Sequence, residues 1–244
     1  MIQKDNKSRN FWDSASKNYD KTEERFAYIH NKSRENTKKY LHTSNVVLDY
    51  GCGTGTTTCE FANLVKEIHA IDISPKMIEI AKEKAAVCQI ENVNFLATDI
   101  FDARLKKESF DTILAFNMLH TITDPHVIVK WIDELLKPNG VFISITPCLR
   151  DKMSLLVNIQ IQFVRFLCKI GVIPIPIRRL KSTELDVLIA NGNFQTVNTE
   201  KIYKGASSYY VVAKKKKVLW VLGPKIGIKI SICIDKESTT MYPI

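Results

Sequence analysis

The sequence predicts an α/β protein built on one seven-stranded, mostly parallel sheet with helices on both faces. Three observations carry this prediction. Short apolar, β-branched runs alternate with longer segments of helical periodicity, which is typical of parallel strands joined by crossover helices. A glycine-rich turn, residues 51–55, follows the first run. Two later runs are followed by acids, Asp72 and Asp99, so polar groups gather at the carboxyl edge of the predicted sheet.

Length and composition fit one globular α/β domain with additions. The chain has 244 residues, of which 25% are charged and 45% hydrophobic. Its first ten residues are polar, so no secretory signal is predicted. The six cysteines show neither a C-x-x-C pair nor a metal-ligand spacing, which predicts no metal site and favours a reducing, cytoplasmic location.

The net charge is +9, and eight lysines without an acid lie between Lys201 and Lys229. One interpretation is a patch for an anionic surface, either nucleic acid or an acidic lipid headgroup. The other is a solvated edge that keeps this end of the chain soluble. The second is favoured because no basic groove with interleaved aromatic residues accompanies the lysines.

The glycine turn organises the chain. Val46–Tyr50 is predicted as a buried strand, and Gly51-Cys52-Gly53-Thr54-Gly55 leads from it into a helix. Glycines at alternate positions permit a sharp turn and a close approach of a ligand to the backbone. A dinucleotide fingerprint, G-x-G-x-x-G, would require glycine where this chain has Thr56. Asp49 would also repel a pyrophosphate and attract an amino group.

The run Leu48-Asp49-Tyr50-Gly51-Cys52-Gly53-Thr54-Gly55 resembles the first motif of class I methyltransferases that use S-adenosylmethionine (SAM). The opening Phe11-Trp12-Asp13-Ser14-Ala15-Ser16-Lys17-Asn18-Tyr19-Asp20 is similar to that of the ubiquinone/menaquinone type, and the resemblance covers residues 11–214. It implies a Rossmann-like class I methyltransferase fold, with SAM as the methyl donor. It also implies a small, hydrophobic or aromatic acceptor and S-adenosylhomocysteine as product.

Three regions are expected. Residues 1–42 are expected to form a cap over the cofactor, with helical structure over 11–41. Within this cap, Tyr19 either contacts SAM or docks on the core. Residues 43–214 form the SAM-binding domain, and 215–244 a C-terminal extension. The predicted strands are 46–50, 67–71, 93–97, 110–116, 141–145, 195–203 and 208–214. The predicted helices that follow the cap are 56 to about 65, 75–87, about 126–136 and 182 to about 190.

Asp72 and Ile73 follow the second strand, 21 positions after Gly51. A carboxylate at this place can accept hydrogen bonds from two ribose hydroxyls. Ser74 and Pro75 supply the cap and the first-turn proline of the next helix. Met77 in that helix is a candidate for contact with adenine, and core packing is the alternative.

The third strand leads to Thr98-Asp99-Ile100. The resemblance implies that Asp99 accepts a hydrogen bond from the adenine amine and that Ile100 packs near the ring. For Asp99 the alternative is an Asx turn that serves the local backbone.

The fourth strand ends at Phe116 and leads to Asn117-Met118-Leu119-His120, which continues an N-x-L-H-x-I-x-D-P run similar to the same family. The resemblance implies that residues here line the space between cofactor and acceptor. His120 is a candidate general base, with a structural hydrogen bond as the alternative. The N/D-P-P-Y/F signature of enzymes that methylate a flipped base is missing, which argues against nucleic acid as substrate.

Two segments stay open. Residues 151–190 are predicted as a lid, and the apolar run within 151–177 fits a substrate cover, a dimer face, ordinary core or peripheral membrane contact. Polar residues interrupt it, so it isn't predicted to span a membrane. Residues 218–234 are predicted as an extra hairpin, with pairing across a homodimer as one interpretation. A SAM-binding module without catalysis is the alternative to an enzyme.

Overall fold

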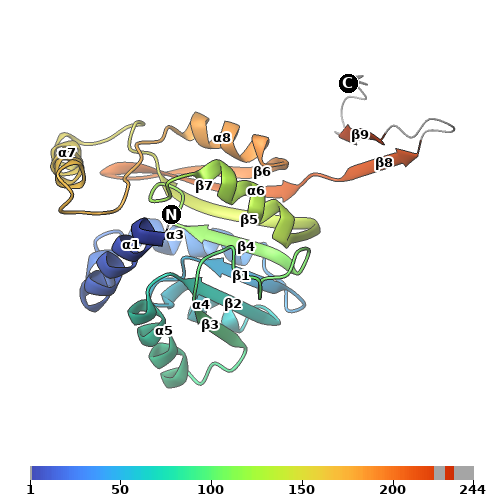
Figure 1. The fold of residues 1–244 in the computed structure, drawn as a ribbon, viewed down its shortest axis with the longest axis horizontal. Coiled ribbons are helices and arrows are strands. Elements are labelled where there is room, and N and C mark those ends of the chain that lie inside the picture. The colour runs from blue at the N-terminus through green and yellow to red at the C-terminus, as the bar shows by residue number, and fades with distance from the viewer. Residues whose placement is uncertain (1, 223–228, 234–244) are drawn as a thin grey trace.

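The computed structural model describes residues 2–222 and 229–233 (Figure 1). The helices are α1 (Ile2–Ala15), the 3-10 turn η1 (Ser16–Asn18), α2 (Tyr19–Glu24), α3 (Ala27–Lys38), α4 (Thr56–Ala62), α5 (Pro75–Val87), α6 (Pro125–Leu135), α7 (Leu155–Lys169) and α8 (Ser182–Asn191). The strands are β1 (Val46–Tyr50), β2 (Glu67–Asp72), β3 (Val93–Ala97), β4 (Phe110–Phe116), β5 (Leu136–Pro147), β6 (Phe194–Lys204), β7 (Ala206–Lys215), β8 (Val218–Leu222) and β9 (Lys229–Cys233).

Seven strands form one sheet in the order β3-β2-β1-β4-β5-β7-β6. Strands β1 to β5 pair in parallel, and β7 pairs antiparallel with both β5 and β6. The chain steps outward from β1 to β2 and β3, and then crosses to the other side of β1 to form β4. The predicted seven-stranded, mostly parallel sheet is confirmed.

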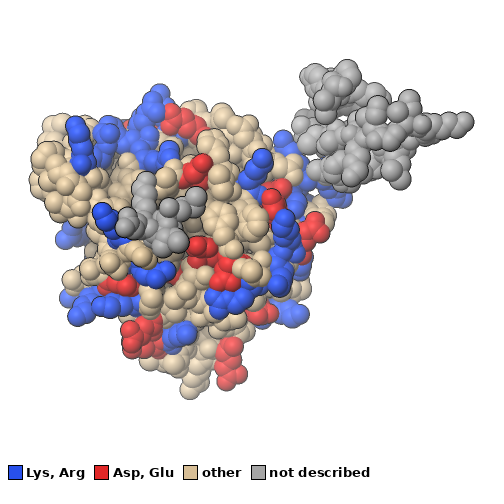
Figure 2. Space-filling model, in the orientation of Figure 1, with Lys and Arg blue, Asp and Glu red and all other residues tan. Residues whose placement is uncertain are grey.

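The lysine-rich end of β7 contributes to the fold through Lys215. Its ammonium group donates to the carbonyl oxygens of Asp133 (2.6 Å) and Leu136 (2.9 Å), at the C-terminal end of α6. A cation there satisfies helix carbonyls and complements the helix dipole. Figure 2 shows basic and acidic side chains interspersed on the face in view. These observations fit the solvated edge better than a patch for nucleic acid.

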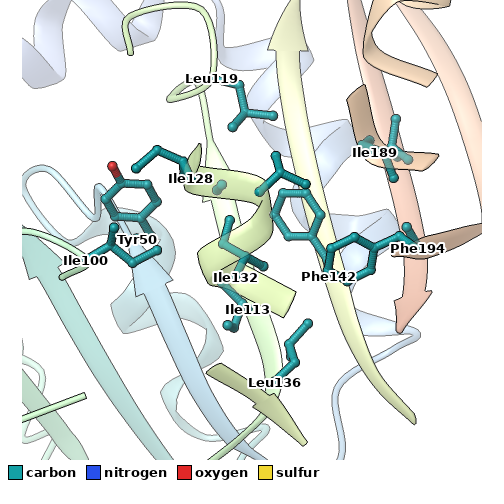
Figure 3. Close-up of a cluster of buried hydrophobic side chains, with 14 of the residues drawn as sticks. Tyr50, Ile100, Ile113, Leu119, Ile128, Ile132, Leu136, Phe142, Ile189 and Phe194 are labelled. Atoms are coloured by element: carbon teal, nitrogen blue, oxygen red, sulfur yellow. The ribbon is translucent and has the colours of Figure 1, made fainter. Parts of the chain in front are cut away.

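The sheet buries both faces, because alternate residues of each strand point to opposite sides. On one face, α6 and α8 cover a cluster that includes Ile113, Phe142 and Phe194 (Figure 3). On the other face, α3, α4 and α5 contribute to a second cluster that includes Phe61. Strands covered on both faces read as continuous apolar runs, which is why their positions could be predicted.

Helices α5 and α6 follow their sequence signals. The Ser74 hydroxyl accepts the Met77 N–H (3.1 Å), and Pro75 opens α5, so the predicted cap is confirmed. In α6 the apolar side is buried, and the Asp124 carboxylate accepts N–H groups of its first turn.

Three element bounds differ from the prediction. Helix α4 ends at Ala62, before Val65, and the helical cap begins at Ile2 and is broken into α1, η1, α2 and α3. Strand β5 begins at Leu136, so Lys137-Pro138-Asn139-Gly140 lies within it. The register shifts between Phe110 and Thr112 of β4, and Asn139 has a φ of +66°. The turn residues therefore form a bulge in the strand, because a bulge uses the same backbone conformations as a turn.

The segment after β5 and the C-terminal extension are unlike the rest. Helix α7 has no buried residue, and five of its large apolar residues are exposed, among them Leu155, Phe163 and Phe166. Strands β8 and β9 pair antiparallel as a separate two-stranded sheet. Residues 223–228 and 234–244, part of the expected extension, lie outside the described residues.

Two further findings concern the described residues. No helix among them is long and apolar enough to cross a membrane. Cys52, Cys59, Cys88, Cys148 and Cys168 are unpaired thiols, and of these five Cys148 is buried and Cys88 is exposed.

We predict that Gly55→Ala destabilises the protein more than Gly171→Ala, although both glycines have a left-handed φ, +76° and +80°. A Cβ on Gly55 would lie 2.7 Å from Ala81 Cβ, whereas a Cβ on Gly171 meets nothing within 4 Å. The conformational cost, roughly 1–2 kcal/mol, is shared. The overlap should cost Gly55→Ala roughly 1–3 kcal/mol more. Urea unfolding measures both, and equal losses would contradict the tight packing of α4 on α5.

Candidate active site

The predicted site residues follow strands β1, β2, β3 and β4, at their carboxyl ends. These four strands are adjacent and parallel, so their carboxyl ends lie along one edge of the sheet. The chain leaves β1 toward β2 on one side and returns to β4 on the other. This reversal is the topological switch point, where α/β sheets bind their ligands.

The glycine turn is fastened to the end of β2. Gly51, Gly53 and Gly55 all have a left-handed φ, of +77°, +54° and +76°. The N–H groups of Gly51 and Cys52 both donate to the carbonyl oxygen of Ile71, at 2.8 and 3.1 Å. Side chains with a Cβ rarely adopt this backbone conformation, so glycine is required here. Thr54 is buried within the turn, and burial raises the pKa of the Cys52 thiol.

Asp49 lies beneath the turn rather than open to it. Its side chain is 2% exposed, and the Thr58 hydroxyl of α4 donates to its carboxylate at 2.6 Å. Burial raises the pKa of Asp49 to about 6, against which the Thr58 hydrogen bond acts. The acid therefore contributes negative charge from below and holds the first turn of α4.

Asp72 connects three parts of the site. One carboxylate oxygen accepts the Gly53 N–H of the glycine turn (3.1 Å), and the other accepts the Ser74 N–H (2.9 Å) that precedes α5. Burial raises the pKa of Asp72 to about 6, and these two hydrogen bonds oppose the shift. A carboxylate oxygen can accept more than one hydrogen bond, so both oxygens keep capacity for a ligand.

The N-terminal cap contacts the glycine turn through Tyr19 and Asp20. A Cβ on Gly53 would lie 3.4 Å from the Tyr19 ring, so this ring covers the turn. Burial raises the pKa of Tyr19, which keeps its hydroxyl protonated. Asp20 accepts the Thr54 hydroxyl (2.6 Å) and forms an ion pair with Lys84 of α5 (2.8 Å).

A second contact of the cap runs through Asp13 of α1. Its carboxylate accepts the Ser74 hydroxyl (2.5 Å) and the Lys76 N–H (3.2 Å). Sequence reasoning missed Asp13, Asp20 and Lys84. The signal for the two acids was present, because both stand in the aromatic opening that was singled out.

After β3, Asp99 is exposed and accepts the Phe101 N–H at 2.8 Å, so the Asx turn that was the alternative for this residue is formed. That hydrogen bond leaves further acceptor capacity on Asp99. Thr98 holds the loop, because its hydroxyl donates to Asp102 at 2.6 Å. Ile100 is fully buried in the core, and its contact with a ligand stays a prediction.

After β4, Asn117 has a φ of +55° and donates its N–H to the Ile145 carbonyl at 2.8 Å. Asparagine tolerates this conformation better than most residues. The next residue, Met118, lies directly on the glycine turn: a Cβ on Gly51 would come within 2.2 Å of its sulfur. Sequence reasoning did not single out Met118, since no local pattern shows that it reaches the first strand.

His120 lies at the end of this loop. Its Nδ1 is buried, with no hydrogen-bond partner among the described residues, and burial lowers the pKa of the imidazole to about 4. The ring is therefore neutral near pH 7. Its backbone carbonyl accepts the Arg178 N–H at 2.8 Å, which ties the loop to the segment after α7.

The remaining predicted residues differ in their exposure to solvent. Met77 is 1% exposed and packs in the core, whereas Cys52, Ile73 and Phe116 are partly exposed. Among residues 2–222, no group of three acidic, histidine or cysteine side chains could hold a metal ion. The site thus combines a bare glycine turn, three carboxylates and a neutral imidazole, which suits a ligand with hydroxyl and cationic groups.

Comparisons with known proteins agree with this geometry. A family model described as a methyltransferase domain matches residues 41–169, more than half of the chain. Ubiquinone biosynthesis O-methyltransferase of Xanthomonas campestris pv. campestris (strain B100) is 28% identical over 147 residues, which are 52% of this chain and 61% of that protein. The chain spans less than two thirds of the length of the curated relatives it matches first.

Solved structures share the fold at low identity. YcgJ from Bacillus subtilis has a TM-score of 0.63 at 17% identity, over 77% of this chain and all of that one. The cyclase SpnF has a TM-score of 0.60 at 17% identity, over 72% of this chain and 77% of that one. These likenesses show the fold alone, because one fold supports different reactions. It is the family match over more than half of the sequence that decides: the chain belongs to the methyltransferase domain family.

Proposed function

We propose that the protein transfers a methyl group from SAM to a small acceptor and releases S-adenosylhomocysteine. One observation carries the choice of cofactor. The Gly53 N–H, which a dinucleotide site would offer to pyrophosphate, is taken by the Asp72 carboxylate at 3.1 Å. A phosphate at this place would face that carboxylate, whereas the ribose hydroxyls and the positive charge of SAM complement it.

The residues of the chain fit SAM part by part. Asp72 would accept the ribose hydroxyls and Asp99 the adenine amine, while the bare backbone of the glycine turn permits a close approach of the amino-acid tail. Tyr19 covers the turn from the cap. When bound, SAM supplies a methyl group already activated by the sulfonium. The protein's part is to hold donor and acceptor in line and to exclude water.

The acceptor side supports an oxygen nucleophile on an apolar molecule. The curated relative is named as an O-methyltransferase of ubiquinone biosynthesis. Transfer to a hydroxyl group requires loss of a proton, and a neutral His120 can accept it. The exposed apolar residues of α7 are consistent with an apolar acceptor. A homodimer and peripheral membrane contact stay predictions, and so does the part of 151–190 as a lid.

The first of three predictions from the proposed function tests the cofactor. SAM should bind to the wild-type protein in calorimetry, and NADH should not. Asp99→Ala removes an acceptor for the adenine amine and should weaken SAM binding roughly tenfold. Asp124→Ala is the matched control, because Asp124 is also an exposed acid that accepts backbone N–H groups. Equal SAM affinity in the two variants would contradict the adenine contact, and no binding to the wild type would refute the function.

The second prediction concerns protons. In the free protein the pKa values of Asp49 and Asp72 are about 6, so both carboxyls are partly protonated near that pH. SAM, with its net positive charge, favours the ionised forms. Its binding should therefore release protons near pH 6, and its affinity should rise from about pH 5 to about pH 7.

Calorimetry in two buffers of different ionisation enthalpy measures this release. Asp49→Asn keeps an oxygen for Thr58 and removes one titrating group, so the variant should release fewer protons. Binding enthalpies that are independent of the buffer at pH 6 would show that neither carboxyl senses the ligand.

The third prediction concerns His120. His120→Ala should lower kcat by about 10²–10⁴ and leave SAM affinity unchanged, if the imidazole accepts the proton. Burial lowers the pKa of His120 to about 4. The wild-type kcat should therefore fall at acid pH only near that value, below the pKa of 6.5 of a free histidine. The assay is methyl transfer from labelled SAM to a panel of hydroxylated aromatic compounds.

His126→Ala is the matched control, because His126 is an exposed histidine at the start of α6. Its kcat should equal that of the wild type. An unchanged kcat in His120→Ala would show that His120 is not the general base and has a structural role only. Absence of transfer to every compound of the panel, with SAM bound, would favour the binding-only module.

A further inference from the structure

A basic hollow of about 760 Å³ lies between the loop after β5, helix α7 and the start of α8. Four arginines line it: Arg150 after β5, Arg165 on α7, and Arg178 and Arg179 in the segment before α8. Glu184 of α8 is the one acid among its lining residues. Figure 2 shows Lys and Arg side chains gathered on this face between α7 and α8.

Each guanidinium group retains free donors. Arg150 forms an ion pair with Glu184, and Arg165 donates one hydrogen bond to the Gln162 side chain (3.1 Å). Arg179 uses only its Nε, which donates to the Leu149 carbonyl at 3.0 Å. An arginine has five N–H donors, so most of these groups still face the hollow or solvent.

Charge in the hollow is not balanced. Glu184 can neutralise one guanidinium, which leaves an excess of positive charge among the lining residues. Like charges held together repel one another, so stability alone gives no reason to gather them. Guanidinium groups bind phosphate oxygens through paired, charge-assisted hydrogen bonds, which makes arginine the preferred residue for such a site.

Arg178 connects the hollow to the site. Its backbone N–H donates to the His120 carbonyl at 2.8 Å, and its side-chain Nε donates to the Ile122 carbonyl at 2.9 Å. A further guanidinium N–H donates to the Thr123 carbonyl. One residue therefore both lines the hollow and fixes the loop that carries the candidate base.

We propose that this hollow binds a phosphate or diphosphate group carried by the methyl acceptor. Ile177 and Leu180 add apolar surface to the lining, which suits an acceptor with an apolar body next to its anionic group. The assignment to the acceptor rests on the proposed function. Binding of the anionic group itself rests only on the four arginines.

The test is calorimetry with inorganic pyrophosphate on the full chain. Arg165→Gln removes an exposed guanidinium whose one side-chain partner is Gln162, so the variant should fold. It should bind pyrophosphate roughly tenfold more weakly than the wild type, and a double variant with Arg179→Gln weaker still. Arg25→Gln is the matched control, because Arg25 is exposed and lies between α2 and α3, away from the hollow. It should bind as the wild type does.

Vesicles identify the source of the phosphate group. If protein binds phosphatidylglycerol vesicles but neither phosphatidylcholine vesicles nor pyrophosphate, and Arg165→Gln abolishes this, the hollow accepts a lipid headgroup. If pyrophosphate binds and the protein does not bind such vesicles, the group comes from a soluble acceptor, which supports the proposal. Failure to bind pyrophosphate and anionic vesicles, or equal binding by wild type and Arg165→Gln, would overturn the proposal.

A SAM titration of the same proteins separates the two proposals. The arginine variants should keep wild-type SAM affinity. Arginine-dependent pyrophosphate binding without SAM binding would leave the hollow as a phosphate site and refute the methyltransferase function. SAM binding without pyrophosphate or vesicle binding would support the methyltransferase function and refute the phosphate site in the hollow.

Discussion

The site depends on the pair of hydrogen bonds that the Asp72 carboxylate accepts. Through Gly53 it holds the glycine turn after β1, and through Ser74 it holds the start of α5. The Ser74 hydroxyl in turn accepts the Met77 N–H and donates to Asp13, so the helix cap and the N-terminal cap meet at the same point. A single half-buried carboxylate thus joins the turn after the first strand, the end of the second strand and the start of one helix, and Ser74 extends this connection to the N-terminal cap.

This arrangement costs stability. A carboxylate taken out of water loses hydration, and its raised pKa is the sign of that cost. Asp49 lies nearby in a similar state, and its charge raises the pKa of the Cys52 thiol further. Two buried acids of like sign are an unfavourable choice for packing alone. They are favourable where a ligand brings positive charge and hydroxyl groups, so the cost itself indicates the kind of ligand.

Local signals determined how much of the fold could be predicted. Helix α5 has the predicted bounds because Ser74 and Pro75 mark its start by capping chemistry that needs no distant partner. The predicted start of β5 was wrong because Lys137-Pro138-Asn139-Gly140 has the composition of a turn. Its pairing with β4 depends on Phe110, a residue far from it in sequence. Signals within a few residues were sufficient for most strands, and contacts between strands decided this one.

The same distinction explains the site. Residues that directly follow strands β1 to β4 could be named from the sequence, because parallel strands bring their carboxyl ends together wherever they occur. Met118 against Gly51 and Arg178 against His120 join segments that no periodicity connects. Both contacts lie on the side that we propose for the acceptor. The side that we propose for the cofactor is thus formed by a repeated strand pattern, whereas the side that we propose for the acceptor is assembled from single residues of separate loops. Such loops can change without disturbing the sheet, so a change of acceptor needs no change of fold.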